Sequence, residues 1–437
     1  MDLVAAFVVF AGTMIASLVC GFSMLWALSA GFLGFMGVGV RRGFAVSELL
    51  RMSWEGMRAS LIVIRVMLTI GVLTGLWRSA GTFAVLTAWG LQLITPSMFV
   101  LAAFLLSCAL SYAIGTSFGA AGTLGVALMT LARSGGVNEL VVGGAILSGI
   151  YFGDRASPAS SCANLVAALT GTELYDNVRL MMRTAFVPFL IALGFYLVLS
   201  LNNPMLSAEN PALTSMNLDF NMSPWAVLPA VLMLALPPLK VKIFHTFLAS
   251  IACAFLCTLL LQGQPLGEAL RCALVGLHAP AGSARAVFNG GGLASMAGIC
   301  AVLAISGTYS GIFGGTGMIG GLQASVAGLM GRWGSYPVTF AIGTLANAVF
   351  CTQALGIMMT VHVVRHPYER KGLSRSELAQ DIANSTVVTA GLVPWCIGCS
   401  VPLAMLGVPA HAVPYAAYLW LLPLCYAFTK RRWFKGL

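Results

Sequence analysis

Long runs of apolar residues, separated by short polar stretches, follow one another along the whole chain. An α-helix needs about 20 such residues to cross the hydrocarbon core of a bilayer. The apolar runs fall at 3–20, 24–40, 60–77, 97–114, 180–200, 224–239, 243–262, 291–308, 338–361 and 412–428. No soluble domain fits between them. The pattern predicts an all-α polytopic membrane protein with about 10–13 membrane segments.

Composition agrees with this prediction. The 437 residues are 59% hydrophobic and 8% charged, with a mean hydropathy of +0.92, whereas soluble domains carry about 25% charged residues. The first four residues, Met-Asp-Leu-Val, lack the basic segment of a signal peptide. The first apolar run is therefore expected to be a retained helix.

The net charge of +10 is a topology signal rather than a sign of nucleic-acid binding, because the basic residues gather in short loops and near the end of the chain. The basic clusters are Arg41, Arg42, Arg51 and Arg58; Arg365, Arg370, Lys371 and Arg375; and Lys430, Arg431, Arg432 and Lys435. By contrast, the linker 202–222 has no Lys or Arg. We expect this linker outside the cell, and both termini on the cytoplasmic side of the cell (inner) membrane.

Several marked positions recur at one spacing. Gly75 and Gly311, Gly81 and Gly317, Thr116 and Thr352, and Pro158 and Pro394 are all 236 positions apart (352 − 116 = 236). An amphipathic connector also occurs in each half, at 47–58 and at 267–276. The chain is therefore predicted to consist of two transmembrane repeats, 1–201 and 223–437, joined by the linker 202–222.

Charge indicates how the two repeats are oriented. The basic loop 361–375 corresponds to 125–139, which holds Arg133 and Glu139 and little other charge. Equivalent loops that differ in positive charge are expected on opposite sides of the membrane. The repeats are therefore predicted to be inverted relative to each other.

Polar residues interrupt the apolar runs near the middle of each half. The segment 115–123, Gly-Thr-Ser-Phe-Gly-Ala-Ala-Gly-Thr, weakens a continuous helix. In the second half, Asn347, Thr352 and Gln353 form one break, and 384–394 forms another. Irregular backbone at membrane depth suits a central binding site made of broken helices or re-entrant hairpins. Close packing of helices through small residues is the structural alternative for 115–123.

Asp154 and Arg155 stand side by side in the otherwise almost uncharged segment 148–164. An ionisable residue at membrane depth is costly and indicates an ion or substrate pathway. If Asp154 is functional, its desolvated carboxylate binds a cation in competition with a proton. If it is structural, Arg155 neutralises it or it caps a helix. Arg155 itself could orient a carboxylate substrate or balance the charge of Asp154.

The remaining motifs do not indicate a redox or catalytic site. Cys396 and Cys399 match a redox spacing, but in a hydrophobic stretch they are expected to be buried structural thiols. A membrane-embedded enzyme would need an acid pair, a metal-ligand cluster or a nucleophile with its base, and no single segment of the sequence carries one. We therefore expect a transporter rather than an enzyme, and no bound cofactor.

With these residues identified, the chain resembles the NhaC-type sodium/proton antiporters. The resemblance covers most of the length and rests on Gly-Leu-Trp at 75–77, the segment 115–123, Tyr-Phe-Gly-Asp-Arg-Ala-Ser-Pro at 151–158, Val-Pro-Trp at 393–395 and Leu-Gly-Val-Pro at 406–409. It implies a secondary active transporter that exchanges sodium for protons, with Asp154 as the sodium-coordinating and titrating carboxylate. The candidate cation or substrate ligands are Asp154, Thr116, Ser117, Ser157, Ser161, Asn164, Asn347, Thr352 and Gln353.

The chain also departs from that family. Sodium-exchanging members typically have a second acid after the Ser-Pro, where this chain has Ser-Ser-Cys-Ala-Asn at 160–164, and the stretch 291–361 contains no Asp or Glu. The missing acids favour an alternative, a sodium- or proton-coupled carrier of an organic anion or amino acid that uses Arg155. The expected partners are sodium and protons or a small organic solute, together with the lipid bilayer. Assembly as a homodimer stays open.

Overall fold

The computed structural model describes residues 2–20, 24–93, 95–158, 160–205, 219–236, 241, 243–280, 285, 288–316 and 322–434. About 82% of the structure is helical, and the described residues contain no strand. This confirms the all-α class. Most of the linker, 206–218, lies outside the described residues, so the division of the chain into two repeats and a linker stays a prediction.

The first half of the chain forms a series of helices, several of them short. They are α1 (Asp2–Cys20), α2 (Met24–Arg41), α3 (Val46–Ser79), α4 (Thr82–Leu93), η1 (Pro96–Met98), α5 (Phe99–Ile114), α6 (Ser117–Ala120), the π-helix η2 (Ala121–Gly125), α7 (Val126–Ser134), α8 (Glu139–Ala156), α9 (Ser161–Thr170) and α10 (Leu174–Asn202).

The second half is interrupted in a similar way. Its helices are η3 (Pro224–Val227), α12 (Leu228–Ala235), α13 (Ile243–Leu260), α14 (Leu266–Leu274), η5 (Leu293–Met296), α15 (Ala297–Thr316), α16 (Leu322–Trp333), α17 (Ser335–Phe350), α18 (Gln353–Arg370), α19 (Arg375–Ala383), α20 (Thr386–Thr389), α21 (Ile397–Leu406), η6 (Ala410–Tyr415) and α22 (Ala417–Trp433).

Two helical stretches in the described part of the chain, Pro96–Ala113 and Leu174–Asn202, are long and apolar enough to cross a membrane on their own. The runs 3–20, 24–40 and 60–77 each fall within one helix, α1, α2 and α3, and α13 covers 243–260 of the run 243–262. The run 338–361 is not one helix, because it is divided between α17 and α18. The connector 47–58 is not separate either, since it continues without a break into the third run as the 34-residue helix α3. The number of membrane segments therefore stays a prediction.

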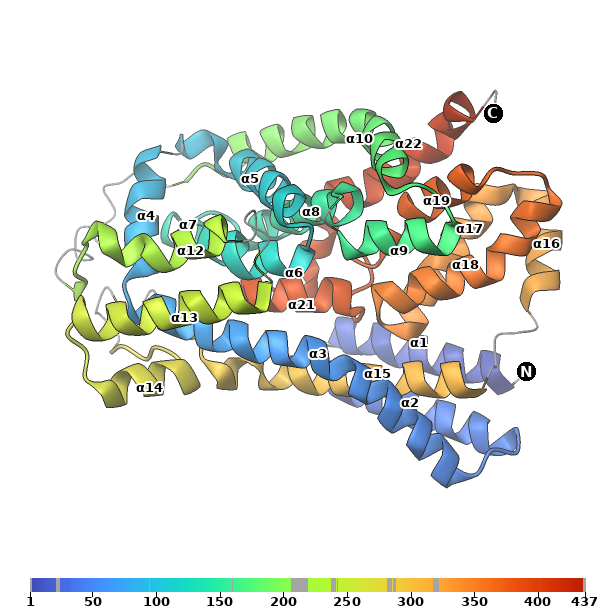
Figure 1. Ribbon diagram of the computed structural model, residues 1–437, viewed down its shortest axis with the longest axis horizontal. Coiled ribbons are helices and arrows are strands. Elements are labelled where there is room, and N and C mark those ends of the chain that lie inside the picture. The colour runs from blue at the N-terminus through green and yellow to red at the C-terminus, as the bar shows by residue number, and fades with distance from the viewer. Residues whose placement is uncertain are drawn as a thin grey trace.

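The helices form two groups (Figure 1). In the first group, α3 packs along α15, α13 and α14, and α2 packs against α1 and α15. The backbones of α3 and α15 touch, since a Cβ on Gly311 would lie 1.8 Å from the Met52 carbonyl oxygen. In the second group, α5 packs on α8, α10 on α22, and α17 on α18. The second group contains the helix breaks.

Helix boundaries recur at the 236-residue spacing found in the sequence. Helix α17 begins and ends 236 positions after α5, and α21 begins and ends 236 positions after α9. Left-handed residues recur as well: Gly115 (φ 73°) matches Cys351 (φ 56°), and Gly171 (φ 67°) matches Gly407 (φ 69°). Such agreement in backbone conformation supports the predicted repeat.

Candidate functional site

The first break separates α5 from α6. Helix α5 ends at Ile114 and is followed by Gly115, whose left-handed backbone suits a residue without a Cβ. Thr116 is extended (φ −147°, ψ 128°), and its Oγ1 accepts a hydrogen bond from the Gly119 N–H at 3.4 Å. The chain thus restarts as a helix at Ser117 and leaves the Ser117 N–H without a partner in its own helix.

Asp154 in the last turn of α8 accepts that N–H. Its side chain is only 3% exposed, and Oδ1 lies 3.4 Å from the Ser117 nitrogen. Oδ2 accepts from Gln353 Nε2 at 3.2 Å. Both donors are neutral, and each is the first residue of a helix that follows a break. The carboxylate therefore lies between the two halves of the chain.

The second break separates α17 from α18 and has the same backbone form. Cys351 is left-handed, and Thr352 is extended (φ −135°, ψ 134°). The Gln353 amide bridges three elements, because Nε2 also donates to the Val387 carbonyl at 2.9 Å and Oε1 accepts from Cys162 Sγ at 3.1 Å. Gln353 therefore holds α8, α9 and α20 together at the carboxylate.

Buried oxygen atoms without a partner lie at this second break. Asn347 donates from Nδ2 to the Thr386 carbonyl at 2.7 Å and to Thr389 Oγ1 at 3.1 Å. Among the described residues, Asn347 Oδ1 and Thr352 Oγ1 are buried and accept no hydrogen bond. A buried, unsatisfied polar atom is costly, and neutral oxygens of this kind are suitable ligands for a small hard cation.

Arg155 does not neutralise Asp154 by direct pairing, since no ion pair joins them in the described structure. The guanidinium is 1% exposed and is bound by neutral oxygens. Its Nη2 donates to the Met181 carbonyl at 3.0 Å, to Thr184 Oγ1 at 2.9 Å and to Asn384 Oδ1 at 2.5 Å. Arg155 thus connects α8 to α10 and to the end of α19.

Three other predicted ligands lie in or beside the α8–α9 connection. Ser157 Oγ donates to the Tyr112 carbonyl at 2.6 Å. Asn164 Nδ2 donates to the Pro158 and Ser160 carbonyls at 3.1 and 2.7 Å, and the side chains of Asn164 and Ser161 are exposed. The structure thus brings Ser117 and Gln353, the first residues after the two breaks, into contact with Asp154, whereas Ser157 and Asn164 hydrogen-bond neighbouring backbone.

Sequence reasoning missed a second buried carboxylate. Asp381 in α19 is 0% exposed. Its Oδ2 accepts from Lys430 Nζ at 2.5 Å and from the Tyr368 hydroxyl, and Oδ1 accepts from the Tyr426 hydroxyl at 2.8 Å. Lys430 Nζ also lies 2.7 Å from Glu377 Oε1. The four-residue spacing of Glu377 and Asp381, which places both on one helix face, is the signal that could have revealed this cluster.

The part of the chain that holds most of this site matches a known protein family. Residues 149–429, which include both carboxylates and the second break, match the model of the Na+/H+ antiporter family. The chain belongs to the Na+/H+ antiporter family. This confirms the predicted resemblance, and the helical structure fits the integral membrane transporters of that family.

Relatives match over most of the chain. The Na(+)/H(+) antiporter NhaC of Bacillus subtilis (strain 168) is 26% identical over 85% of this chain and 84% of its own length. The malate-2H(+)/Na(+)-lactate antiporter of the same organism is 25% identical over 90% and 86%. The arginine/ornithine antiporter ArcD of Halobacterium salinarum is 26% identical over 90% and 82%. The relatives are antiporters rather than enzymes, and their named substrates differ.

Proposed function

We propose that this chain is a sodium/proton antiporter in which Asp154 binds sodium and a proton in turn. The observation that carries the proposal is the position of Asp154, a buried carboxylate between the two helix breaks that is held by two neutral donors, the Ser117 N–H and the Gln353 amide. A buried carboxylate without a cationic partner is costly in a low-dielectric interior. Binding of either a proton or a sodium ion removes that cost, and one ion excludes the other.

The proposed sodium ligands come from both halves of the protein. They are the Asp154 carboxylate, Thr116 Oγ1, and the two unpartnered oxygens Asn347 Oδ1 and Thr352 Oγ1. Gln353 would join them after a half-turn of its amide, which exchanges the Nε2 donor for the Oε1 acceptor. Oxygen ligands from paired helix breaks are the usual means by which transporters coordinate sodium at the membrane midplane.

The proposed mechanism is alternating access by two inverted repeats, 1–201 and 223–437, in the cell (inner) membrane. The 236-residue correspondence between α5 and α17 and between α9 and α21 supports the repeat. A site between repeats opens to either side as one repeat rocks against the other. In this proposal the linker 202–222 lies outside the cell and both termini lie in the cytoplasm, as the distribution of basic residues favours.

A second candidate function is the carriage of an organic anion or amino acid, coupled to sodium or protons. One observation favours it: the stretch 291–361, which contains the second break, has no Asp or Glu. Two relatives are named for malate and lactate and for arginine and ornithine. In this function Arg155 would contribute positive charge near a bound carboxylate.

The deciding experiment measures the sodium-induced collapse of a respiration-generated pH gradient in inverted membrane vesicles. The native chain is compared with Asp154→Asn and with the control Asp176→Asn, which removes an exposed acid from the first turn of α10. A sodium response in the native chain and the control, and none in Asp154→Asn, supports the antiporter. No response in the native chain rejects sodium/proton exchange and directs the assay to malate, lactate, arginine and ornithine.

A further inference from the structure

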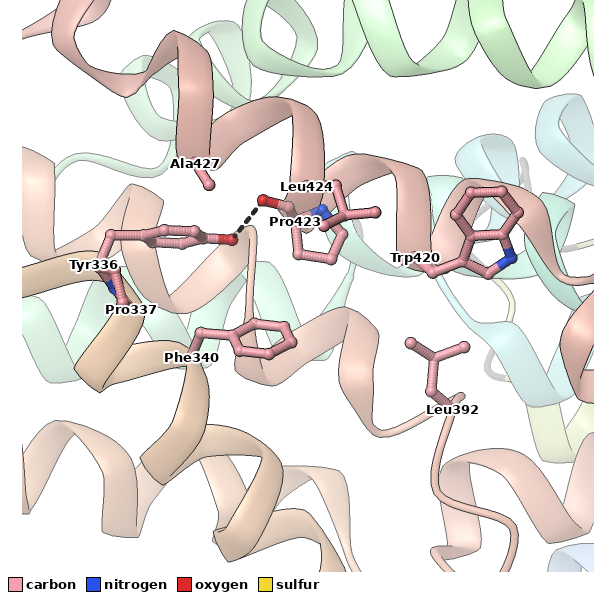
Figure 2. A pocket seen from close by; sticks show the side chains of 8 residues that line it. All are labelled: Tyr336, Pro337, Phe340, Leu392, Trp420, Pro423, Leu424 and Ala427. Atoms are coloured by element: carbon pink, nitrogen blue, oxygen red, sulfur yellow. Dashed lines mark hydrogen bonds between the residues drawn. The ribbon is translucent and has the colours of Figure 1, made fainter.

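An apolar groove lies between α17 and α22 (Figure 2). Its volume is about 320 Å³. The lining residues are Tyr336, Pro337, Phe340, Leu392, Trp420, Pro423, Leu424 and Ala427. Leu424 is 54% exposed, so the groove is open at the molecular surface. The Tyr336 hydroxyl donates to the Pro423 and Asn384 carbonyls at 3.1 and 3.0 Å, which leaves hydrocarbon along the wall of the groove.

The groove continues into a second, polar cavity of about 450 Å³. The two cavities share Tyr336, Pro337 and Ala427. The second cavity is lined in addition by Ser335 at the beginning of α17, Glu377 in the first turn of α19, and Lys430 and Arg431 near the end of α22. Together the cavities form one surface that is apolar along its length and charged at one end.

The charged end has one basic side chain outside the buried ion cluster. Lys430 Nζ lies 2.7 Å from Glu377 Oε1 and 2.5 Å from Asp381 Oδ2, so its charge is taken up by these two carboxylates and the cation left to attract an anion is Arg431. Arg431 follows Lys430, is exposed, and has no ion pair among the described residues. Trp333, which also lines this cavity, is 64% exposed and lies under the Arg332 guanidinium at 5.9 Å. Exposed Trp beside Arg is typical of the headgroup level of a membrane.

We propose that these joined cavities bind an anionic phospholipid, with an acyl chain along the α17–α22 groove and the phosphate headgroup at Arg431. Basic pockets between membrane helices are known to hold anionic headgroups. The continuity of the apolar and basic parts matches one amphiphilic molecule better than a water-soluble anion, which would use only the basic cavity.

Such a lipid would contact the helices that hold Arg155. Tyr336 lines both cavities, and its hydroxyl donates to the Asn384 carbonyl, while the Asn384 side chain accepts from Arg155. The bound lipid therefore stabilises the arrangement of α17, α22 and the end of α19. It lies beside the carboxylate site without taking part in it, and its binding is measurable without any transport assay.

Native mass spectrometry of the full chain, with equal amounts of phosphatidylglycerol and phosphatidylethanolamine, tests the proposal. The native protein should retain phosphatidylglycerol about fivefold more than phosphatidylethanolamine, the effect of one cation near a lipid headgroup. Arg431→Gln should abolish this preference, whereas Arg432→Gln, which changes the neighbouring residue outside the cavity lining, should preserve it. Ala427→Phe, which fills the groove, should reduce retention of both lipids.

Three outcomes would overturn the proposal. The first is equal retention of the two lipids by the native protein. The second is an equal loss of preference in Arg431→Gln and Arg432→Gln, which would mean general attraction to the basic end of α22. The third is displacement of the lipid by soluble glycerol phosphate at the same concentration, which would mean that the site takes a free anion. Thermal unfolding of each variant in detergent confirms that it is folded.

Discussion

The two helix breaks have the same backbone conformation but carry different side chains. Gly115 and Thr116 in the first half have the same left-handed and extended conformations as Cys351 and Thr352 in the second. The side chains that follow differ. Asp154 corresponds to Ala390, and Ser117 corresponds to Gln353, 236 positions later. One half thus provides the carboxylate, and both halves provide its donors.

The hydrogen bonds next to the two breaks also join corresponding positions through different groups. Ser111 accepts from the Gly153 N–H at 3.0 Å, and its counterpart Asn347 donates to Thr389 Oγ1, the counterpart of Gly153. Asp381 corresponds to Ala145 in the first half. The comparison teaches that two breaks can have the same backbone conformation while the residues that carry charge around them differ.

The largest expected effect is on the ion cluster of Lys430, Asp381 and Glu377 in the second half. Lys430→Met leaves the buried carboxylates of Asp381 and Glu377 without their cation and should lower the free energy of unfolding by about 3–5 kcal/mol. Steric trapping in bicelles measures this quantity. Arg432→Met, an exposed change on the same helix end, is the control, and a similar loss in both variants would contradict a structural role of the pair.

The next effect compares Gly153 with its counterpart Thr389. A Cβ at Gly153 would lie 2.0 Å from the Ser111 carbonyl carbon, so Gly153→Ala must separate α8 from α5. We expect a loss of about 3 kcal/mol, the upper part of the range for overpacking. Thr389→Ala removes one hydrogen bond from Asn347 and should cost about 1 kcal/mol. The same unfolding measurement checks both variants. Equal losses of unfolding free energy would contradict the tighter packing at Gly153.

A smaller effect separates the two donors to Asp154. Gln353→Ala removes a side-chain hydrogen bond to the carboxylate and a proposed sodium ligand. We expect it to raise the half-maximal sodium concentration about tenfold, as for a hydrogen bond to a charged group. Ser117→Ala keeps the backbone N–H and should change this concentration by less than about threefold. The vesicle assay at a series of sodium concentrations measures both, and the reverse order would show that the side chain of Ser117 matters more.

The smallest effect concerns the two left-handed residues. Gly115→Ala places a Cβ in a conformation that disfavours it and should cost about 1 kcal/mol. Cys351→Gly relieves the same cost and should stabilise the protein by up to about 1 kcal/mol, less the entropy lost by glycine on folding. Thermal unfolding in detergent shows whether each variant is less or more stable than the native protein. A destabilised Cys351→Gly would mean that the thiol contributes more packing than its conformation costs.

The sequence alone predicted the all-α class and pointed to Asp154, which the structure buries beside Ser117 and Gln353, because apolar length and charge within apolar sequence are local signals. The role of Asp154 in transport stays a prediction. The sequence did not predict the partners of Arg155, which come from Met181, Thr184 and Asn384 on other helices. It predicted the break at Asn347, Thr352 and Gln353 within the run 338–361, but not that Cys351, a residue other than glycine, is left-handed there. Contacts between distant helices are set by packing that apolar patterning does not encode.

The most direct test of the central claim is the number of protons released when sodium binds to the purified protein. Calorimetry in buffers of different ionisation enthalpy measures this number for the native chain, Asp154→Asn and Asp176→Asn. The account predicts about one proton released per sodium bound by the native chain and Asp176→Asn, at a pH where the sodium-free site is protonated, and neither binding nor release in Asp154→Asn. Sodium binding without proton release, or release that persists in Asp154→Asn, would contradict it.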